Sequence, residues 1–269
     1  MRVDIKGFFS KKPVIGVVHL PPLPGSPDYM GSFEDVLERA VRDVKNLVEN
    51  GVDAIIVENF MDTPYSIRVR NPETIAAFSI ISWELKKIVD CPIGLNLLRN
   101  SGPEAYAIAC IINADFIRVN ALVEHIWAPE GLLTPVAREI MLKRRSLNCY
   151  DVAVFADVNV KHGKPVMDLD MAVREAITRG KADAVIVTGK HTSEPPDPST
   201  AYYVKSISDK PVVIGSGITP DNIRLYWDLA DGFIVGTYFK VKSITTNPVD
   251  PSKVRRLMTL VNKLRKQGS

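Results

Sequence analysis

Two glycine-bearing stretches near the C-terminus, Ile214-Gly215-Ser216-Gly217-Ile218 and Ile234-Val235-Gly236-Thr237, are the strongest indication of the fold. Each begins in a short apolar run of the kind that forms a buried β-strand. Thr219-Pro220 follows the first stretch and predicts a helix start, because Thr caps helices and Pro suits the first helical position. Two such turns on consecutive strands are typical of the phosphate-binding end of a (β/α)8 barrel.

These stretches allow two interpretations. In the first, the turns bind a phosphate through backbone N–H groups, and the binding residues are Gly215, Ser216, Gly217, Gly236 and Thr237. In the second, the glycines only permit tight turns between strand and helix. The order of the two stretches and their separation of about twenty residues favour phosphate binding.

Six further apolar runs precede these two, and all eight are separated by amphipathic helical patterns. The runs are nearly continuously apolar, which is typical of parallel strands buried on both faces. They cover Val14–Val18, Ala54–Val57, Ile93–Leu97, Phe116–Val119, Val152–Ala156, Ala184–Val187, Val212–Ile214 and Phe233–Val235.

Eight uninterrupted strand–helix units favour an α/β protein with one closed (β/α)8 (TIM) barrel over residues 1–269, rather than an open doubly wound sheet. In that barrel we expect Leu97, Val119 and Val187 to be buried. The stretch Ala121–Leu133 lacks a helical pattern and predicts a long loop, of the kind that forms lids or interfaces.

Helix starts are marked by a capping side chain followed by proline. Ser32 with Asp35 three residues later resembles a capping box. The dipeptides that predict a start are Asn71-Pro72, Thr134-Pro135, Asp197-Pro198, Thr219-Pro220 and Asp250-Pro251.

Composition excludes several classes of protein. The 269 residues are 46% hydrophobic and 24% charged, as in globular proteins, and a net charge of +3 argues against a nucleic-acid partner. No apolar run reaches the roughly 18 residues of a membrane span, and the N-terminus lacks an apolar signal segment. We therefore expect a cytoplasmic protein without integral membrane contact.

The three cysteines, Cys91, Cys110 and Cys149, are far apart and have no metal-ligand spacing. An odd number of scattered cysteines is typical of a reducing compartment, so we expect free thiols, with Cys110 packed in the core. No HxH or HExxH spacing supports a metal site, and we predict no cofactor; the alternative is a divalent metal held by His19 and His162 with Glu58 and Asp157.

Chemistry in such a barrel lies at the carboxyl ends of the strands. Polar side chains gather there in this sequence, and desolvating them costs several kcal/mol unless they pair or bind a ligand. They predict a functional pocket rather than a solvated rim. The residues are His19, Glu58, Asn96, Arg118, Asp157, Lys161 and Thr188.

Four of these residues are candidates for catalysis. Glu58 and Asp157 come from different strands, so they could flank a sugar ring, one holding hydroxyls and the other moving a proton; a structural salt bridge is the alternative for Asp157. Lys161 could act as an acid, an imine-forming nucleophile or a phosphate partner. His19 could act as an acid or base.

The remaining residues at the strand ends are candidates for substrate binding. Arg118 either contacts the ligand or holds carboxylates beneath it. Asn96 and Thr188 are expected to bind substrate together with the phosphate turns.

Several motifs resemble the BtpA/SgcQ family over essentially the whole chain. They include Val17-Val18-His19-Leu20-Pro21-Pro22-Leu23-Pro24-Gly25-Ser26-Pro27, Ile56-Val57-Glu58-Asn59-Phe60 and Phe155-Ala156-Asp157-Val158-Asn159-Val160-Lys161-His162. The resemblance implies a barrel of the ribulose-phosphate-binding type. It associates cyanobacterial members with photosystem I biogenesis and the SgcQ branch with nucleosidase activity. The chain departs from the family pattern at Asn159, where many relatives carry His.

Two functions remain open. The first is an enzyme that binds a small phosphorylated metabolite, a sugar or nucleoside, and acts as a nucleosidase, lyase or isomerase. The second is a non-catalytic biogenesis factor that works through protein or membrane-surface contacts. The intact set of polar strand-end residues favours the enzyme. The oligomeric state is left open, with a homo-oligomer allowed.

Overall fold

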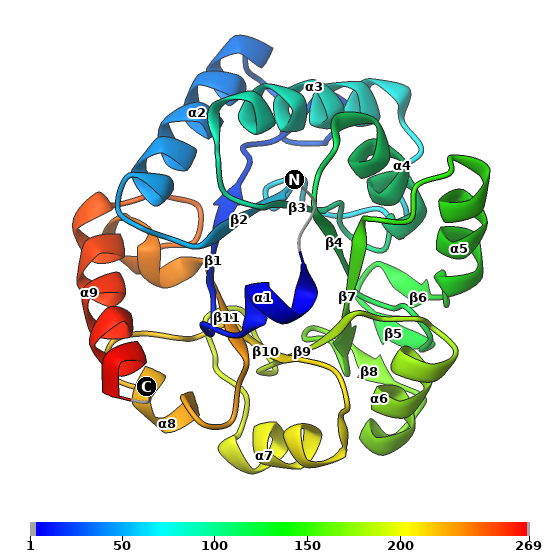
Figure 1. The fold of residues 1–269 in the computed structure, drawn as a ribbon. Coiled ribbons are helices and arrows are strands. Elements are labelled where there is room, and N and C mark those ends of the chain that lie inside the picture. The colour runs from blue at the N-terminus through cyan, green and yellow to red at the C-terminus, as the bar shows by residue number, and fades with distance from the viewer. Residues whose placement is uncertain (1–3, 268–269) are drawn as a thin grey trace.

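The structure, a computed structural model that describes residues 4–267, contains a closed barrel of eight parallel strands surrounded by helices (Figure 1). Around the barrel the order is β1, β2, β3, β4, β7, β9, β10 and β11, which pairs again with β1. Their bounds are Val14–His19, Ala54–Glu58, Ile93–Asn96, Phe116–Val119, Ala153–Val158, Ala184–Thr188, Val212–Gly215 and Gly232–Val235.

Each predicted apolar run is one of these strands, and Leu97, Val119 and Val187 are buried as expected. The predicted α/β class and closed barrel are therefore confirmed.

The helices form an outer layer, and each turns an apolar face toward the strands. In α2, for example, Val36, Ala40, Val44 and Leu47 recur at helical spacing and are buried. The helices are α2 (Phe33–Val48), α3 (Pro72–Ile88), α4 (Gly102–Ile112), α5 (Ala137–Ser146), α6 (Leu169–Thr178), α7 (Pro198–Ile207), α8 (Ile223–Tyr226) and α9 (Pro251–Gln267), with 3₁₀ turns η1 (Thr237–Phe239) and η2 (Val241–Ser243) after β11.

Four predicted helix starts are confirmed. Ser32 Oγ accepts a hydrogen bond from the backbone N–H of Asp35, and an Asp197 carboxylate oxygen accepts one from Ser199 N–H. The helices α3 and α9 begin at the prolines of Asn71-Pro72 and Asp250-Pro251.

Two predicted starts are wrong. After Thr219-Pro220, the side chain of Asn222 accepts a hydrogen bond from Thr219 N–H and donates one to the Gly217 carbonyl. Because these bonds form a polar turn, the four-residue helix α8 begins only at Ile223. After Thr134-Pro135, the N–H groups of residues 136 and 137 donate to the Leu122 carbonyl, so α5 begins at residue 137. The helix that follows the Gly215–Gly217 turn in the chain therefore does not begin directly at the turn.

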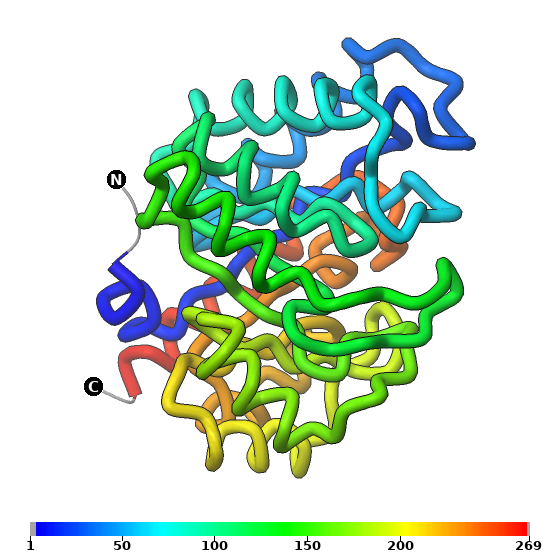
Figure 2. The backbone as a smooth tube through the Cα atoms, turned by 90° about the vertical axis from the view of Figure 1, so that its right-hand side faces the viewer, coloured from blue at the N-terminus to red at the C-terminus, as the bar shows by residue number. Residues whose placement is uncertain are grey.

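The stretch Ala121–Leu133, expected as a loop, contains two strands. β5 (Ile126–Ala128) pairs antiparallel with β6 (Gly131–Leu133) and with β8 (Lys164–Pro165), which follows β7. The hairpin carries Trp127 on its surface. In Figure 2 it projects on the side of the barrel opposite to α1 (Ile5–Phe9) and the end of α9.

The helix α1 covers the amino-terminal end of the barrel. In Figure 1 it crosses the barrel's centre. Phe8 and Phe9 are buried among the inward-facing strand residues, and the ring of Phe9 lies 5.6 Å from that of Phe155, centroid to centroid. This short helix carries no strong sequence signal.

Strand periodicity explains how the barrel positions its polar residues. Successive strand side chains alternate between the interior and the helix layer. Val17 on β1 and Ile56 on β2 belong to the inner core cluster, and two residues further on His19 and Glu58 also point inward. The same rule places Asn96, Arg118, Asp157 and Thr188 inside the carboxyl end.

The cysteine prediction is corrected. Cys110 and Cys149 form a disulfide, with their Cα atoms 5.9 Å apart, so they are not free thiols. The fold brings α4 beside the segment that precedes β7, across 39 residues of chain. Cys91 is a free thiol, and burial raises its pKa to about 11.

Candidate functional site

Arg118 lies at the centre of the polar network inside the barrel. Its Nε and Nη2 donate to the two oxygens of Asp157 at 2.9 and 3.0 Å, and its Nη1 donates to Glu58 Oε1 at 3.1 Å. All three side chains are buried. Burial opposes the charge of Arg118, but the two carboxylates outweigh it and raise the guanidinium pKa above its usual range. Arg118 therefore stays charged and joins the two acids.

Both carboxylate oxygens of Asp157 accept hydrogen bonds from protein side chains. Besides the two bonds from Arg118, its Oδ2 accepts from Asn120 Nδ2 at 2.6 Å. It does not line the cavity that Glu58 and Arg118 line. The structure thus places Asp157 beneath the cavity, and the two carboxylates meet on one guanidinium instead of facing each other across a ring.

Glu58 and His19 present two hydrogen-bond acceptors to the cavity. Glu58 Oε1 is held by Arg118 and by Asn96 Nδ2, which leaves Oε2 at 3.8 Å from His19 Nε2. Burial and the nearby Lys240 ammonium keep the pKa of His19 well below its usual value, so the ring is neutral. His19 Nδ1 lies 3.1 Å from the Thr245 carbonyl, an acceptor, which assigns the ring proton to Nδ1. The lone pair of Nε2 therefore faces the Glu58 carboxylate.

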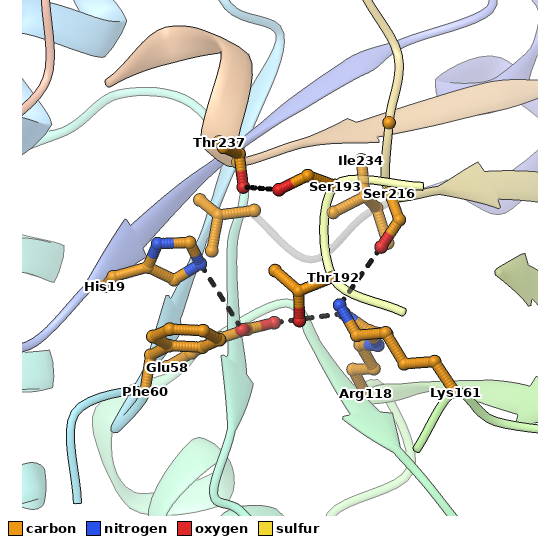
Figure 3. A pocket seen from close by; sticks show the side chains of 13 residues that line it. His19, Glu58, Phe60, Arg118, Lys161, Thr192, Ser193, Ser216, Ile234 and Thr237 are labelled. Atoms are coloured by element: carbon orange, nitrogen blue, oxygen red, sulfur yellow. Dashed lines mark hydrogen bonds and ion pairs between the residues drawn. The ribbon is translucent and has the colours of Figure 1, made fainter. Parts of the chain in front are cut away.

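Lys161 approaches the cavity from the opposite side (Figure 3). Its Nζ donates to Ser216 Oγ at 3.0 Å, and its backbone N–H donates to Thr188 Oγ1 at 3.2 Å. Burial and the positive charge of Arg118 lower the pKa of Lys161 to about 8. Its amine is therefore partly neutral near physiological pH.

Backbone groups at the carboxyl ends of β10 and β11 line the cavity between Lys161 and His19. Ser216 accepts the Lys161 hydrogen bond, and Gly236 lies against the His19 ring. Within residues 4–267, no hydrogen bond of the turns and loops is donated by the N–H groups of Gly217, Gly236 or Thr237, and these three residues line the cavity together with Ser216. Ser216 and Gly217 both have positive φ, 74° and 65°, in the left-handed region.

The cavity has two connected parts. The inner pocket, about 30 Å³, is bounded by His19, Glu58, Lys161, Ser216 and Thr237. The outer pocket, about 290 Å³, adds Tyr65, Asn96, Arg99, Asn120 and Glu130. Both share Glu58, Phe60, Arg118, Lys161 and Thr192.

The segment between β9 and α7 covers the inner pocket. Thr192 and Ser193 line it, and Ser193 Oγ donates to Thr237 Oγ1 at 2.9 Å (Figure 3). A Cβ on Gly217 would overlap the backbone of Glu194 and Pro195. The glycine therefore serves close packing of this segment as well as the turn.

The structure brings most of the predicted residues together. His19, Glu58, Arg118, Lys161, Ser216, Gly217, Gly236 and Thr237 line the inner pocket, and Asn96 lines the outer one. Gly215 ends β10 without lining either pocket. Thr188 lies in a neighbouring groove and fixes the backbone of Lys161.

Sequence reasoning missed Arg99, Tyr65, Glu130, Thr192 and Ser193. Arg99 is buried, donates to Asn120 Oδ1 at 3.1 Å and to the Lys161 carbonyl at 2.7 Å, and lies only three residues beyond the end of β3. Extending the strand-end search by three residues would have found it. Thr192 and Ser193 lie in a loop without any periodic signal.

Two absences hold for the described part of the chain. No group of three or more His, Cys, Asp or Glu residues is arranged to hold a metal ion. None of the helices within residues 4–267 has the length and apolar character needed to cross a membrane.

A closed barrel of eight parallel strands with helices between them defines a TIM barrel. The chain belongs to the BtpA family, whose model matches residues 10–263. It is 46% identical over 257 residues to an uncharacterised protein of Pyrococcus horikoshii, covering 96% of this chain and 98% of that one. It is 40% identical over 250 residues to the photosystem I biogenesis protein BtpA of Synechocystis, covering 92% and 87%.

Solved structures with the same fold are more distant. The (S)-3-O-geranylgeranylglyceryl phosphate synthase of Thermoplasma acidophilum, solved with sn-glycerol-1-phosphate, has a TM-score of 0.62 at 15% identity and covers 98% of this chain and 100% of its own. The orotidine 5'-phosphate decarboxylase of Pyrococcus horikoshii has a TM-score of 0.55 at 15% identity, covering 92% and 99%.

Proposed function

We propose that this protein is an enzyme that binds a phosphorylated sugar, or a sugar-bearing metabolite such as a nucleoside phosphate, in the inner and outer pockets. The observation that carries the proposal is that one cavity presents both hydrogen-bond acceptors and donors. Glu58 Oε2 and His19 Nε2 are the acceptors, and Lys161 Nζ with the backbone N–H groups of Gly217, Gly236 and Thr237 are the donors.

A ligand that satisfies this cavity must present hydroxyls at one end and an anion at the other. Each of the two acceptors needs its own donor, and neighbouring sugar hydroxyls supply one to each. The backbone donors, together with the Lys161 charge, suit a phosphate. Two of the structural neighbours have phosphate compounds in their names, which agrees with this assignment. Because their sequence identity to this chain is low, the similarity itself shows only a shared fold.

Glu58 is the group best placed for proton transfer. Arg118 and Asn96 hold its Oε1, which orients Oε2 toward the cavity. As a carboxylate, it can accept a proton from a hydroxyl or a carbon beside a carbonyl, as lyase or isomerase chemistry requires. In a nucleosidase it would stabilise an oxocarbenium-like transition state. Asp157 acts through Arg118 as a positioning residue.

Calorimetry with ribose 5-phosphate, ribose and inorganic phosphate tests the proposal. We expect ribose 5-phosphate to bind more tightly than ribose. Lys161→Met should weaken that binding by about 10- to 100-fold, since a charge-assisted hydrogen bond contributes about 1.5–3 kcal/mol. Lys190→Met is the matched control, because Lys190 is an exposed lysine outside both pockets. Equal affinities for ribose 5-phosphate and ribose would overturn the phosphate assignment.

A second candidate follows from the name of the Synechocystis relative, a photosystem I biogenesis protein. Under it, the chain would act as a non-catalytic assembly factor through protein or membrane-surface contacts. Loss of function in a biogenesis assay with a surface variant, and none with Glu58→Gln, would favour this candidate over the enzyme.

A further inference from the structure

Within residues 4–267, Lys161 differs from the buried Lys240 in having no carboxylate within salt-bridge distance. The two nearest network acids, Glu58 and Asp157, both pair with Arg118. Within the described chain, Lys161 Nζ donates its hydrogen bond to a neutral hydroxyl, that of Ser216. Lys240, by contrast, donates to the Val17 carbonyl at 3.0 Å and lies 3.8 Å from Asp43 Oδ2.

We propose that Lys161 Nζ is a nucleophile that forms an imine with the carbonyl carbon of an open-chain phosphorylated sugar bound across the inner and outer pockets. This inference rests on the proposed function and narrows it. The substrate class becomes a phosphorylated aldose or ketose, and the reaction class becomes carbon–carbon cleavage or isomerisation through a protonated imine.

The chemistry balances without a co-reactant. The Lys161 ammonium first gives one proton to solvent, and the neutral amine adds to the carbonyl carbon to form a carbinolamine. The carbinolamine oxygen then takes up one proton and leaves as water. The product is a protonated imine, so one ammonium and one carbonyl become one iminium and one water.

The surroundings of Lys161 suit a nucleophile as well as a phosphate partner. A lysine that serves as a fixed positive charge gains from an acidic neighbour, whereas Lys161 lies near Arg118, and Arg99 donates to its backbone carbonyl. Burial and, after it, these cations lower its pKa to about 8, with Glu58 and Asp157 acting in the opposite direction. At pH 7.5 about a quarter of the amine is neutral, against about one part in a thousand for an ordinary lysine.

The acceptors opposite Lys161 provide for the later proton transfers. Glu58 Oε2 is free of the Arg118 contact and shares the inner pocket with Lys161. An iminium withdraws electrons from the adjacent carbon–hydrogen or carbon–carbon bond. A carboxylate on the other side of a 30 Å³ pocket is in place to accept the proton released.

Reductive trapping tests the inference. The full-length protein is incubated at pH 7.5 with dihydroxyacetone phosphate, or with dihydroxyacetone, and sodium cyanoborohydride, and the adducts are mapped by peptide mass spectrometry. We expect modification of Lys161 at least 20-fold faster than of the exposed Lys190, with a pH midpoint near 8. Lys240 should stay unmodified, because its side chain is fully buried. Lys161→Arg should abolish the adduct while circular dichroism shows the same fold.

The two probes separate this inference from the proposed function. Trapping at Lys161 with equal efficiency for both probes would support the imine and refute phosphate recognition. Calorimetric binding of dihydroxyacetone phosphate without an adduct at Lys161 would refute the imine and leave phosphate recognition intact. Neither binding nor trapping would refute both. An adduct that Lys190 carries at the same rate as Lys161 would also overturn the imine.

Discussion

Reduction of the Cys110–Cys149 disulfide should destabilise the protein by an amount that depends on the number of residues between the two cysteines. The bond links residues 39 apart. Closing a loop of that length removes about 13 cal/mol/K of entropy from the unfolded chain in the loop-entropy model, or about 4 kcal/mol at 25 °C. For a domain of this size, 1 kcal/mol corresponds to a melting-temperature shift of about 2–4 °C. We therefore expect a decrease of about 8–16 °C.

Differential scanning calorimetry with and without dithiothreitol measures this effect. Cys149→Ala should melt like the reduced wild type and should not respond to the reductant. Cys91→Ala is the control, because Cys91 is a free thiol, and it should retain the full response. A wild-type melting temperature that dithiothreitol leaves unchanged would refute the stabilising role of the bond.

Two further predictions concern buried charges. Arg118→Met should lower the free energy of unfolding by about 3–5 kcal/mol in urea titrations, because it leaves Glu58 and Asp157 buried without a cation; an effect below 1 kcal/mol would contradict the network. Burial raises the pKa of Glu124 to about 7 from 4.5, and its Oε2 accepts from Asn159 N–H. The folded protein therefore keeps this proton between pH 4.5 and 7 while the unfolded chain loses it, so stability falls as pH rises through that range. Glu124→Gln should abolish this decrease in stability, raising the free energy of unfolding at pH 8 by about 3 kcal/mol and leaving it unchanged at pH 4. An equal increase at both pH values would refute the raised pKa of Glu124.

Much of the fold could be predicted because its signals are local. A continuous apolar run such as Val212–Ile214 already indicates a strand buried on both faces, and Asp197-Pro198 carries its own helix cap. The candidate site could be predicted in outline for the same reason. Once the strands are placed, alternation of side chains determines that His19 and Glu58 follow Val17 and Ile56 into the barrel.

The eight strand–helix units and the set of polar residues at their carboxyl ends could be predicted from the sequence, because both follow from residue type and short-range periodicity. The partners of those residues are known only from the folded arrangement. Arg118 takes both carboxylates and leaves Lys161 without one, and Asp157 lies beneath the cavity. Contacts between distant segments depend on distances that no local pattern contains. For the same reason, the sequence did not predict the Cys110–Cys149 disulfide or the position of Thr192 over the inner pocket.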